Sequence, residues 1–540
     1  NTGFNYGSSF RSANATANIS IGDNNTGNLT LQFGSLSTNA YANSIALNSS
    51  GAYVIEGNSG ASFASTIDFS NSYTLGSLGT SFRIGSTTNN QNVWMKPAVT
   101  VSGPITAYAN EFSIYNNLTS TSASDIGIYA KTHFWTYDVR QTLQTAGGNI
   151  YLYADADANG SGQLELDYLT FNPGSGNTII RGETFNFAIG AAGPYLNGTG
   201  SITIEPSDAV FGQGIQTMWF TFDQDNNGMG GLNLGKSGNT AQISFDGTNI
   251  TAGGPVNIYG NNIVMSAALT ANGSDVSLYA NTAVTQVLPI IAAGLSLNGT
   301  GTFTLTNTSN NFTTLAGGAT GSLLGATQIV DASGGLTIGT VGSNTGLKGS
   351  STLRVETLAG DLTLAGSIST TSTSTDALIL TSGKNTAIGV ATGGDIIVSG
   401  SPTITMGTGA IAKLFSGNDA TSTGLNTLVG GTANARYNYD ETSTTFNPAL
   451  SANNKYAIYR TAVGYGDLII VASGGDAEGT TWNYVNGVIK TLSGSANVLN
   501  TVVQTKLNAA NLSIEANKII FSANVTGTTS NSLSILAKTH

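Results

Sequence analysis

The chain has 540 residues, including 70 glycines, 9 prolines and no cysteine, and only 9% of its residues are charged. The absence of cysteine excludes disulfides, thiol catalysis and thiolate metal sites, and it suits a bacterial protein that unfolds for export. The formal net charge of −11 argues against nucleic acid and anionic membranes as partners. No apolar run reaches the roughly 18 residues that a membrane span needs.

The first hundred residues contain short runs in which apolar residues alternate with polar ones. Leu29, Leu31 and Phe33 form one such run, and Tyr53 and Ile55 form another. A period of two is typical of half-buried β-strands, and the Gly and Asn residues that close each run are typical of turns. The pattern predicts many short strands joined by tight turns, with few helices.

A phrase of 29 residues then occurs more than once. Residues 105–133 and 512–540 match without a gap, and residues 256–282 repeat the phrase with one residue fewer. Each copy contains three short apolar-alternating runs. We therefore expect a repeat protein in which each copy forms coils of a β-solenoid that cover their neighbours.

A second internal match shows that a longer block is duplicated. Residues 82–104 resemble residues 232–255, and the match aligns Gly85 with Gly235. A block of about 150 residues therefore occurs twice, as expected if coils were added by copying.

The regular spacing of the predicted strands changes in the last quarter of the chain. We predict a β-solenoid over residues 1–410, an inserted or irregular lobe rich in tyrosine and charge over 411–466, and a continuation of the solenoid over 467–540. Exposed tyrosines are typical of interfaces. The candidate binding residues of the lobe are Tyr437, Tyr439, Tyr456 and Tyr459. The alternative is that the lobe is a small structural domain with its own core.

Two acidic turns share one spacing that suits calcium. Carboxylate and amide oxygens at alternate positions before a glycine resemble the first half of an EF-hand loop. The candidate metal ligands are Asp155, Asp157 and Asn159 in the first turn, and Asp223, Asp225 and Asn227 in the second. Neither turn has the closing glutamate, since Leu166 and Leu234 stand there. The alternative is that both are Asx-type turns that cap strand ends.

Few groups in the sequence are suited to catalysis. The two histidines, His133 and His540, are equivalent positions of one repeat, and no cofactor is expected other than calcium. We therefore expect no enzyme. The alternative is a polysaccharide-degrading β-helix, for which the nearest cluster is Asp138, Arg140, Asp155 and Asp157.

Several phrases together resemble the large repetitive bacterial exoproteins of the filamentous-haemagglutinin type. The stretches that carry the resemblance are residues 254–286, 301–318, 331–341, 354–370 and 413–460, the last with the phrases SG…TGL, RYN and YAIYR. The resemblance implies an all-β, right-handed parallel β-helix, secretion, and a role in adhesion or matrix assembly. No secretion-recognition domain or anchor is recognisable, which leaves the export route and the attachment open.

These observations predict a non-enzymatic structural or adhesive protein outside the cell or on the bacterial surface. Its expected partners are surface glycans or other cells. Because both ends of the sequence lie inside repeat phrases, we also expect either end-to-end self-association or continuation in a longer chain. The first residue is Asn1 rather than an initiator Met, which is expected of a mature product or a slice of something longer. The alternative function is a polysaccharide-binding or polysaccharide-degrading β-helix, including the phage-tail type.

Overall fold

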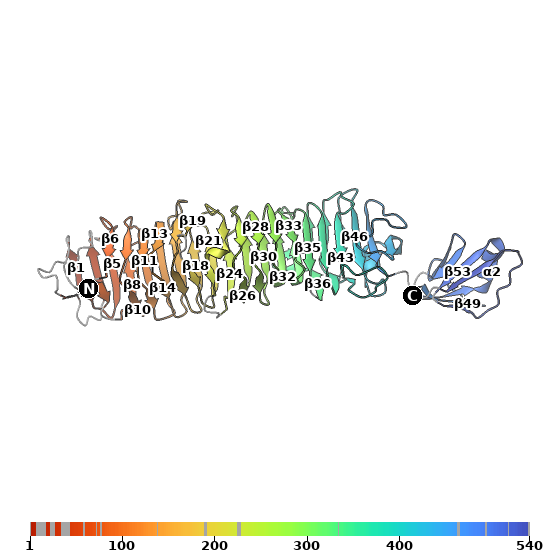
Figure 1. Ribbon diagram of the computed structural model, residues 1–540, viewed down its shortest axis with the longest axis horizontal. Coiled ribbons are helices and arrows are strands. Elements are labelled where there is room, and N and C mark those ends of the chain that lie inside the picture. The colour runs from red at the N-terminus through yellow and green to blue at the C-terminus, as the bar shows by residue number, and fades with distance from the viewer. Residues whose placement is uncertain are drawn as a thin grey trace.

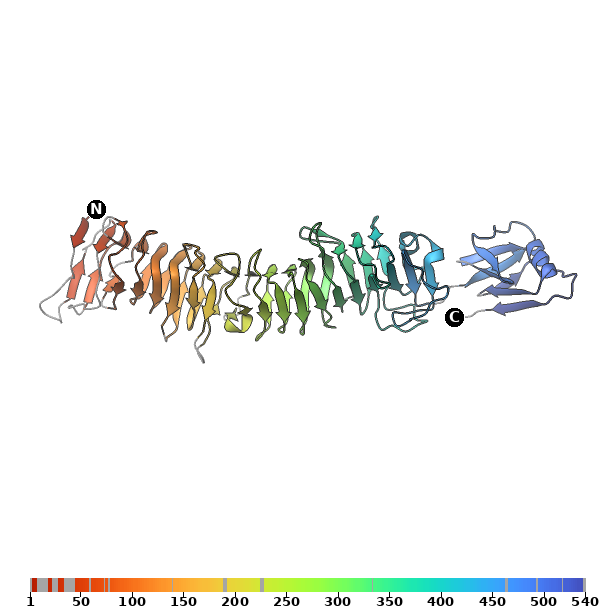
Figure 2. The ribbon, with the colours of Figure 1, turned by 90° about the horizontal axis from the view of Figure 1, so that it is seen from above.

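The computed structural model describes most of the chain. The described residues are 2–6, 18–21, 28–33, 44–57, 60–71, 73–75, 78–137, 139–187, 192–223, 228–332, 334–461, 465–491, 494–516 and 518–537. Figures 1 and 2 show a long rod of stacked coils followed by a small unit at the blue end of the chain.

One coil of the rod contains three short strands. A central example consists of β27 (Val256–Tyr259), β28 (Asn262–Met265) and β29 (Leu269–Ala271). Each of these strands pairs in parallel with a strand of the preceding coil. The partners are, in the same order, β24 (Gly231–Leu234), β25 (Ile243–Phe245) and β26 (Ile250–Ala252). Parallel pairing of each strand with the strand one coil earlier defines a parallel β-helix. The prediction of an all-β solenoid is confirmed.

The first strand of every coil belongs to one unbroken column, which we call column one. Its strands in chain order are β1 (Thr2–Tyr6), β3 (Leu29–Phe33), β5 (Ala52–Glu56), β8 (Ser81–Ile84), β11 (Ile105–Ile114), β13 (Ile126–Thr136), β15 (Ile150–Ala154), β18 (Thr178–Arg181), β21 (Ser201–Glu205), β24, β27, β30 (Val276–Tyr279), β32 (Ile290–Asn298), β34 (Asn311–Gly317), β36 (Gly335–Ile338), β41 (Asp361–Leu364) and β44 (Ile396–Val398). Every consecutive pair is parallel.

A second column runs through the later coils to the end of the rod. It contains β22 (Ile215–Gln216), β25, β28, β31 (Ala283–Gln286), β33 (Thr302–Leu305), β35 (Thr327–Asp331), β40 (Leu353–Thr357), β43 (Leu378–Thr381), β46 (Ile411–Ser416), β48 (Asn454–Tyr459) and β47 (Ala435–Tyr437). The remaining strands of the rod are β2 (Asn18–Ile21), β4 (Ser44–Leu47), β6 (Ile67–Phe69), β7 (Tyr73–Leu75), β9 (Val93–Met95), β10 (Val99–Val101), β12 (Leu118–Ser120), β14 (Gln141–Gln144), β16 (Gln163–Glu165), β17 (Leu169–Asn172), β19 (Thr184–Asn186), β20 (Tyr195–Leu196), β23 (Thr221–Phe222), β37 (Thr340–Val341), β38 (Asn344–Thr345), β39 (Leu347–Gly349), β42 (Ile368–Thr370) and β45 (Ile404–Thr405).

The core of the rod is a continuous stack of aliphatic and aromatic side chains. Alternate residues of each strand point inward, so that Ile258, Ile263 and Leu269 of one coil are all fully buried. Each such side chain contributes roughly 1.5–3 kcal/mol of transfer free energy on burial. Since a coil buries its apolar side chains largely against its neighbours, stability depends on stacking rather than on any one coil.

The repeated phrase covers two successive paired strands and the chain between them. Ile105 pairs with Ile126 and Leu512 pairs with Leu533, a distance of 21 residues in both copies. Val256 pairs with Val276, one residue less, which matches the single deletion in that copy. The one-residue difference between the copies is therefore a difference in the length of chain between two paired strands.

The segment predicted as an irregular lobe closes the end of the rod. Its first strand, β46, continues the second column, and β48 pairs with β46. Between them lie α1 (Leu425–Leu428), η3 (Thr432–Asn434) and β47, which pairs with β48. Arg460 is fully buried behind this segment and donates to the carbonyl oxygens of Ser382 and Gly394. Residues 417–461 therefore form a cap over the last coil.

The last part of the chain differs from the predicted continuation of the coils. Its elements are β49 (Tyr465–Val471), β50 (Trp482–Val485), β51 (Val488–Thr491), β52 (Gly494–Leu499), α2 (Asn500–Ala509), β53 (Leu512–Ala516), β54 (Ile519–Phe521) and β55 (Leu533–Ala537). One sheet has the order β52–β49–β54, with the earliest strand in the middle, whereas a coil stacked in chain order would place β52 there. These residues also have their own core around Trp482 and Ile514. We call residues 465–537 the terminal unit.

Among the described residues of the rod, the helix η2 (Thr217–Trp219) precedes β23. Within the described ranges, no helix has both the length and the apolar character to cross a membrane.

Candidate functional site

The first predicted calcium turn is held together by its own carboxylate. Asp155 is buried and has a left-handed backbone conformation, with φ of 72°. Its carboxylate accepts hydrogen bonds from the amides of Asn159 (2.7 Å) and Gly160 (2.9 Å), while Asp157 is exposed. This geometry is that of an Asx-type turn, which was the alternative interpretation of the sequence.

Asp155 instead has acidic neighbours from the two following coils. Its carboxylate oxygens lie with those of Glu183 and Asp208 in one cluster, within 4.8 Å of one another. The hydroxyl of Ser207 is 2.8 Å from Asp155 and 2.7 Å from Glu183. Carboxylate oxygens are the ligands that calcium prefers. The residues that could hold such an ion are therefore Asp155, Glu183 and Asp208 rather than Asp157 and Asn159.

The second predicted calcium turn is described only at its two ends. Asp223 also has a positive φ, 52°, and its carboxylate accepts a hydrogen bond from the amide of Gly228 at 3.0 Å. Asp225 and Asn227 lie outside the described residues. The described ends match the first turn, in which an aspartate accepts from the amide of the glycine five residues later.

The four tyrosines predicted to form a contact surface are structural residues of the cap. Tyr456 and Tyr459 are buried, and Tyr437 stacks on Tyr459 with ring centroids 5.1 Å apart. Tyr439 packs against Phe446. Burial and the hydrogen bond to Asp419 raise the pKa of Tyr437, and burial likewise raises the pKa of Tyr459. The prediction of a tyrosine contact surface is therefore corrected, because two of these rings are buried and the other two are half-buried against neighbouring aromatic rings.

The described residues that were considered for catalysis contact different partners. His133 lies 3.5 Å from Glu165, and the guanidinium of Arg140 stacks 3.6 Å from the ring of Tyr195. Asp138 and His540 lie outside the described residues.

A ladder of aromatic and charged side chains follows the outer face of column one. Strand pairing aligns Tyr108, Tyr129, Tyr153, Arg181 and Glu205, one from each of five successive coils. The first two rings are stacked, with centroids 5.2 Å apart. The Arg181 guanidinium lies over the ring of Tyr153 and pairs with Glu205.

The same ladder contains a second tyrosine pair further along the rod. Tyr259 aligns with Tyr279, and their rings are stacked with centroids 4.1 Å apart. Both side chains are partly exposed. Burial, followed by the hydrogen bond with Tyr279, raises the pKa of Tyr259 to about 12. Two stacked tyrosine pairs therefore lie on one face of the rod.

A glycine and an asparagine support each tyrosine pair in the same way. Asn89 donates its side-chain amide to the carbonyl oxygen of Tyr108 at 2.9 Å, and Asn239 donates to that of Tyr259 at 2.7 Å. Gly85 and Gly235, four residues earlier, have φ of 76° and 74°. The two supports are 150 residues apart, so they are the same element of the duplicated block.

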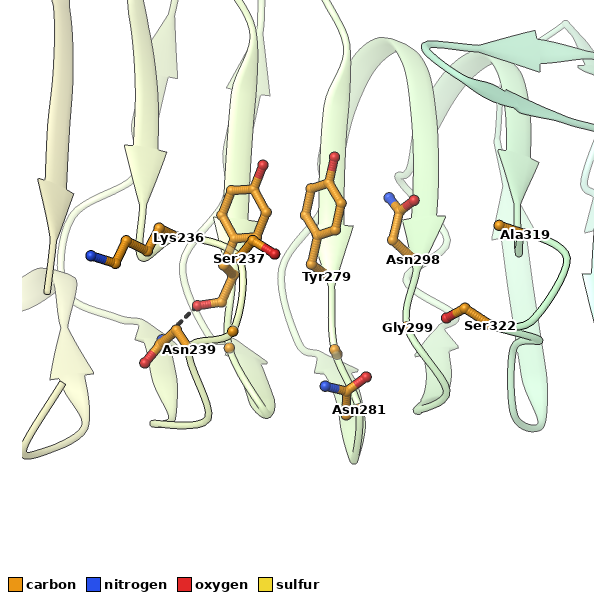
Figure 3. A pocket seen from close by; sticks show the side chains of 13 residues that line it. Lys236, Ser237, Asn239, Tyr279, Asn281, Asn298, Gly299, Ala319 and Ser322 are labelled. Atoms are coloured by element: carbon orange, nitrogen blue, oxygen red, sulfur yellow. Dashed lines mark hydrogen bonds between the residues drawn. The ribbon is translucent and has the colours of Figure 1, made fainter. Parts of the chain in front are cut away.

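Each tyrosine pair lines a shallow depression. The first depression, of about 240 Å³, is lined by Thr87, Asn89, Tyr108, Ala109, Tyr129, Lys131, Ala156 and Asp157. The second depression, of about 300 Å³, is lined by Lys236, Ser237, Gly238, Asn239, Tyr259, Gly260, Tyr279, Ala280, Asn281, Asn298, Gly299, Ala319 and Ser322. In Figure 3, Lys236 and Asn298 lie on opposite sides of the Tyr279 ring. Six lining positions of the first depression recur 150 or 151 residues later in the second.

The second depression continues toward the N-terminal end of the rod. A neighbouring hollow of about 360 Å³ shares Lys236, Ser237 and Tyr259 with it and is also lined by Arg181 and Glu205. A ladder of polar side chains runs beside these residues, in which Asn257 donates to Asn233 at 2.9 Å and Asn233 donates to Thr203 at 3.2 Å. We call this outward side of column one, with its two stacked tyrosine pairs, the tyrosine face. It carries aromatic rings, amides and hydroxyls along several coils.

The sequence contained one signal for this face. The tyrosines Tyr108 and Tyr259 occupy the same place in two copies of the repeated phrase, and Gly85 aligns with Gly235. The signal marks the duplication, but the alignment of the tyrosines into one ladder depends on the register of the coils.

Comparison of this chain with protein-family models, with curated proteins and with solved structures finds no match.

Proposed function

We propose that the chain is a structural or adhesive rod of the bacterial cell surface, acting outside the cell without catalysis. The observation that carries the proposal is the unbroken parallel column from β1 to β44, which makes a long, regular body from one chain. Ion pairs lie along the outside of the rod, such as Arg83 with Glu56 and Lys413 with Asp376. The resemblance to large repetitive exoproteins supports the proposed location.

Electron microscopy and an adhesion assay test this function together. Negative-stain images of the purified chain are expected to show straight rods, and beads coated with the chain are expected to attach to bacterial cells or to extracted surface material. Beads coated with an unrelated acidic protein of similar size are the control. Rods that attach to nothing would contradict adhesion, and strings of separate globules would contradict the rod.

We also propose that the rods associate end to end through the terminal unit. Strand β55 lies at the edge of its sheet, where unpaired strand edges favour association. Ile535 and Leu536 on this strand are 49% and 42% exposed, and Phe521 on β54 is 44% exposed. The substitution Ile535→Lys is expected to shift the chain toward single rods in analytical ultracentrifugation. Thr501→Lys on the exposed side of helix α2 serves as a control, and equal association of both variants and the wild type would contradict the proposal.

The second candidate function is a polysaccharide-binding or polysaccharide-degrading β-helix. The observation that favours binding is the tyrosine face of column one, because aromatic rings beside amides and hydroxyls suit sugars. Incubation with bacterial polysaccharides distinguishes the two activities, since only degradation releases reducing ends. If release occurs, the variants Asp155→Asn and Asp157→Asn test whether those carboxylates contribute.

A further inference from the structure

We propose that the first and second depressions are two equivalent binding sites for one carbohydrate chain lying along the rod. This inference names a ligand class for the adhesive surface and so rests on the proposed adhesive function. It depends on three observations: the shared support of the two tyrosine pairs, the chemistry of their linings, and their alignment on one face.

The two depressions are the same structure built twice. In each depression, a short loop begins at a glycine with positive φ. An asparagine on that loop donates a hydrogen bond to the carbonyl oxygen of the first tyrosine. The second tyrosine follows one coil later and stacks on the first. After duplication, the requirement for a folded coil would preserve only the core residues. Here the outward-facing tyrosines occur in both copies as well, although the core does not require them.

The lining of each depression suits a sugar better than an apolar or strongly charged ligand. A tyrosine ring offers an apolar face and a polar tip, and sugars present both C–H groups and hydroxyls. Asn281 and Asn298 provide amides that both donate and accept, and Ser237 and Ser322 provide hydroxyls. Each depression also contains one lysine, Lys131 or Lys236. Neutral and acidic sugars can both form hydrogen bonds with these amides, hydroxyls and lysines.

The shape of the face suits a chain rather than a small molecule. Small-molecule sites enclose most of their ligand, whereas the second depression opens into the neighbouring hollow beside Arg181 and Glu205. An extended polymer could follow these openings along column one.

The register of column one fixes the distance between the two sites. From Tyr108 the ladder passes through Tyr129, Tyr153, Arg181 and Glu205, and after the coil of β24 it reaches Tyr259. These are six steps of parallel pairing, which at about 4.8 Å each give about 29 Å. A chain that spans this distance can occupy both sites, so that its second contact forms at high effective concentration.

The test uses the full chain and a panel of immobilised bacterial polysaccharides, with a neutral arm and a uronate-containing arm. Wild-type protein is expected to bind at least one arm, measured by biolayer interferometry. The double variants Tyr108→Ala/Tyr129→Ala and Tyr259→Ala/Tyr279→Ala are each expected to weaken binding by on the order of 10²-fold, because each leaves only one site. The fourfold variant is expected to lose binding. The corresponding Tyr→Phe variants keep the rings and are expected to retain most of it.

Tyr195→Ala is the matched control, because Tyr195 is a half-buried tyrosine on strand β20, outside column one. Circular dichroism and thermal melting verify that each variant is folded. Failure of the wild type to bind any polysaccharide, or unchanged binding by the fourfold variant, would overturn the proposal. Bead adhesion is measured on the same preparations. If the fourfold variant still adheres to cells, the two sites are rejected while the adhesive function stands.

Discussion

Gly235 and Tyr259 meet across two successive coils at the edge of the second depression. The backbone of Gly235 has φ of 74°, and a Cβ atom at this position would lie 2.4 Å from the carbonyl oxygen of Tyr259. The same carbonyl oxygen accepts a hydrogen bond from the side-chain amide of Asn239. Glycine is therefore required here both by the left-handed conformation and by the closeness of the next strand.

The substitution Gly235→Ala is expected to destabilise the rod. A side chain with positive φ costs roughly 1–3 kcal/mol, and the contact with the Tyr259 carbonyl adds to this cost. The measurement is the urea midpoint, followed by tryptophan fluorescence.

Gly273→Ala is the matched control for that variant. Gly273 has φ of 64°, but a Cβ atom there would have nothing within 4 Å. It therefore carries the conformational cost without the clash. We expect Gly235→Ala to unfold at a lower urea concentration than Gly273→Ala, and equal midpoints would show that the carbonyl contact contributes nothing.

Ionisation of Tyr259 is expected to destabilise the fold at high pH. Burial and the Tyr279 hydrogen bond raise its pKa to about 12 in the folded chain, from an ordinary value of 10.0. Below pH 10 the hydroxyl is protonated in both states, so its contribution to stability is fully present. Between about pH 10 and pH 12 the unfolded chain loses the proton first, and this contribution is lost.

The variant Tyr279→Phe separates the effect of the hydrogen bond between Tyr259 and Tyr279 from the effect of burial. Carbon-13 labelling of tyrosine rings allows the titration of Tyr259 to be followed by nuclear magnetic resonance. We expect the pKa of Tyr259 to fall toward 10 in this variant but to stay above it, because burial is the larger cause. Tyr279→Phe with an unchanged Tyr259 titration would show that the hydroxyl pair is not formed.

The carboxylate of Asp155 is expected to stabilise the three coils that it joins. It accepts from the amides of Asn159 and Gly160 and from the hydroxyl of Ser207, two coils away. A hydrogen bond to a charged group contributes about 1.5–3 kcal/mol, while removal of one charge relieves repulsion with Glu183. We expect Asp155→Asn to lose about 1–2 kcal/mol by urea unfolding. Asp157→Asn changes an exposed group and is expected to stay within about 0.5 kcal/mol of the wild type.

Calcium binding at these residues stays a prediction, and thermal melts test it. The wild type is melted with added calcium and with a chelator, and the variant Asp208→Asn is melted under the same conditions. Calcium held by Asp155, Glu183 and Asp208 would raise the wild-type midpoint and leave that of Asp208→Asn nearly unchanged. Equal wild-type midpoints in the two conditions would contradict calcium binding.

The fold could be predicted from the sequence because its signals are local. Alternation of apolar residues defines each strand, and the repeated phrase defines a coil. The neighbours of a side chain across coils could not be predicted in the same way. Val256 pairs with a residue 20 positions later, whereas Ile202 pairs with one 30 positions later, because loops of different length leave the coils. The grouping of Asp155 with Glu183 therefore depends on loop lengths that no local pattern reveals.

The cap shows the other limit of prediction from sequence. A cluster of tyrosine and arginine is typical of an interface, but it also suits a small core in which each polar tip has a partner. Tyr437 donates to Asp419, and the guanidinium of Arg436 lies 4.8 Å from the ring of Tyr456. Composition is the same in both cases, and only burial distinguishes them.

The last prediction concerns Arg460, which holds the cap against the final coils. Its guanidinium donates to the carbonyl oxygens of Ser382, Thr392 and Gly394, and burial lowers its pKa. Arg460→Ala would leave three carbonyls without this donor, each at a cost of about 1–3 kcal/mol when buried. Because coils near an end unfold locally, the expected result is faster hydrogen exchange in β46 and β48, with little change at β27. Arg460→Lys keeps the charge and is expected to exchange at an intermediate rate, while Lys455→Ala, on strand β48 just before Arg460, should resemble the wild type. Exchange in β46 that is equal in Arg460→Ala and the wild type would show that the cap is held by its apolar core alone.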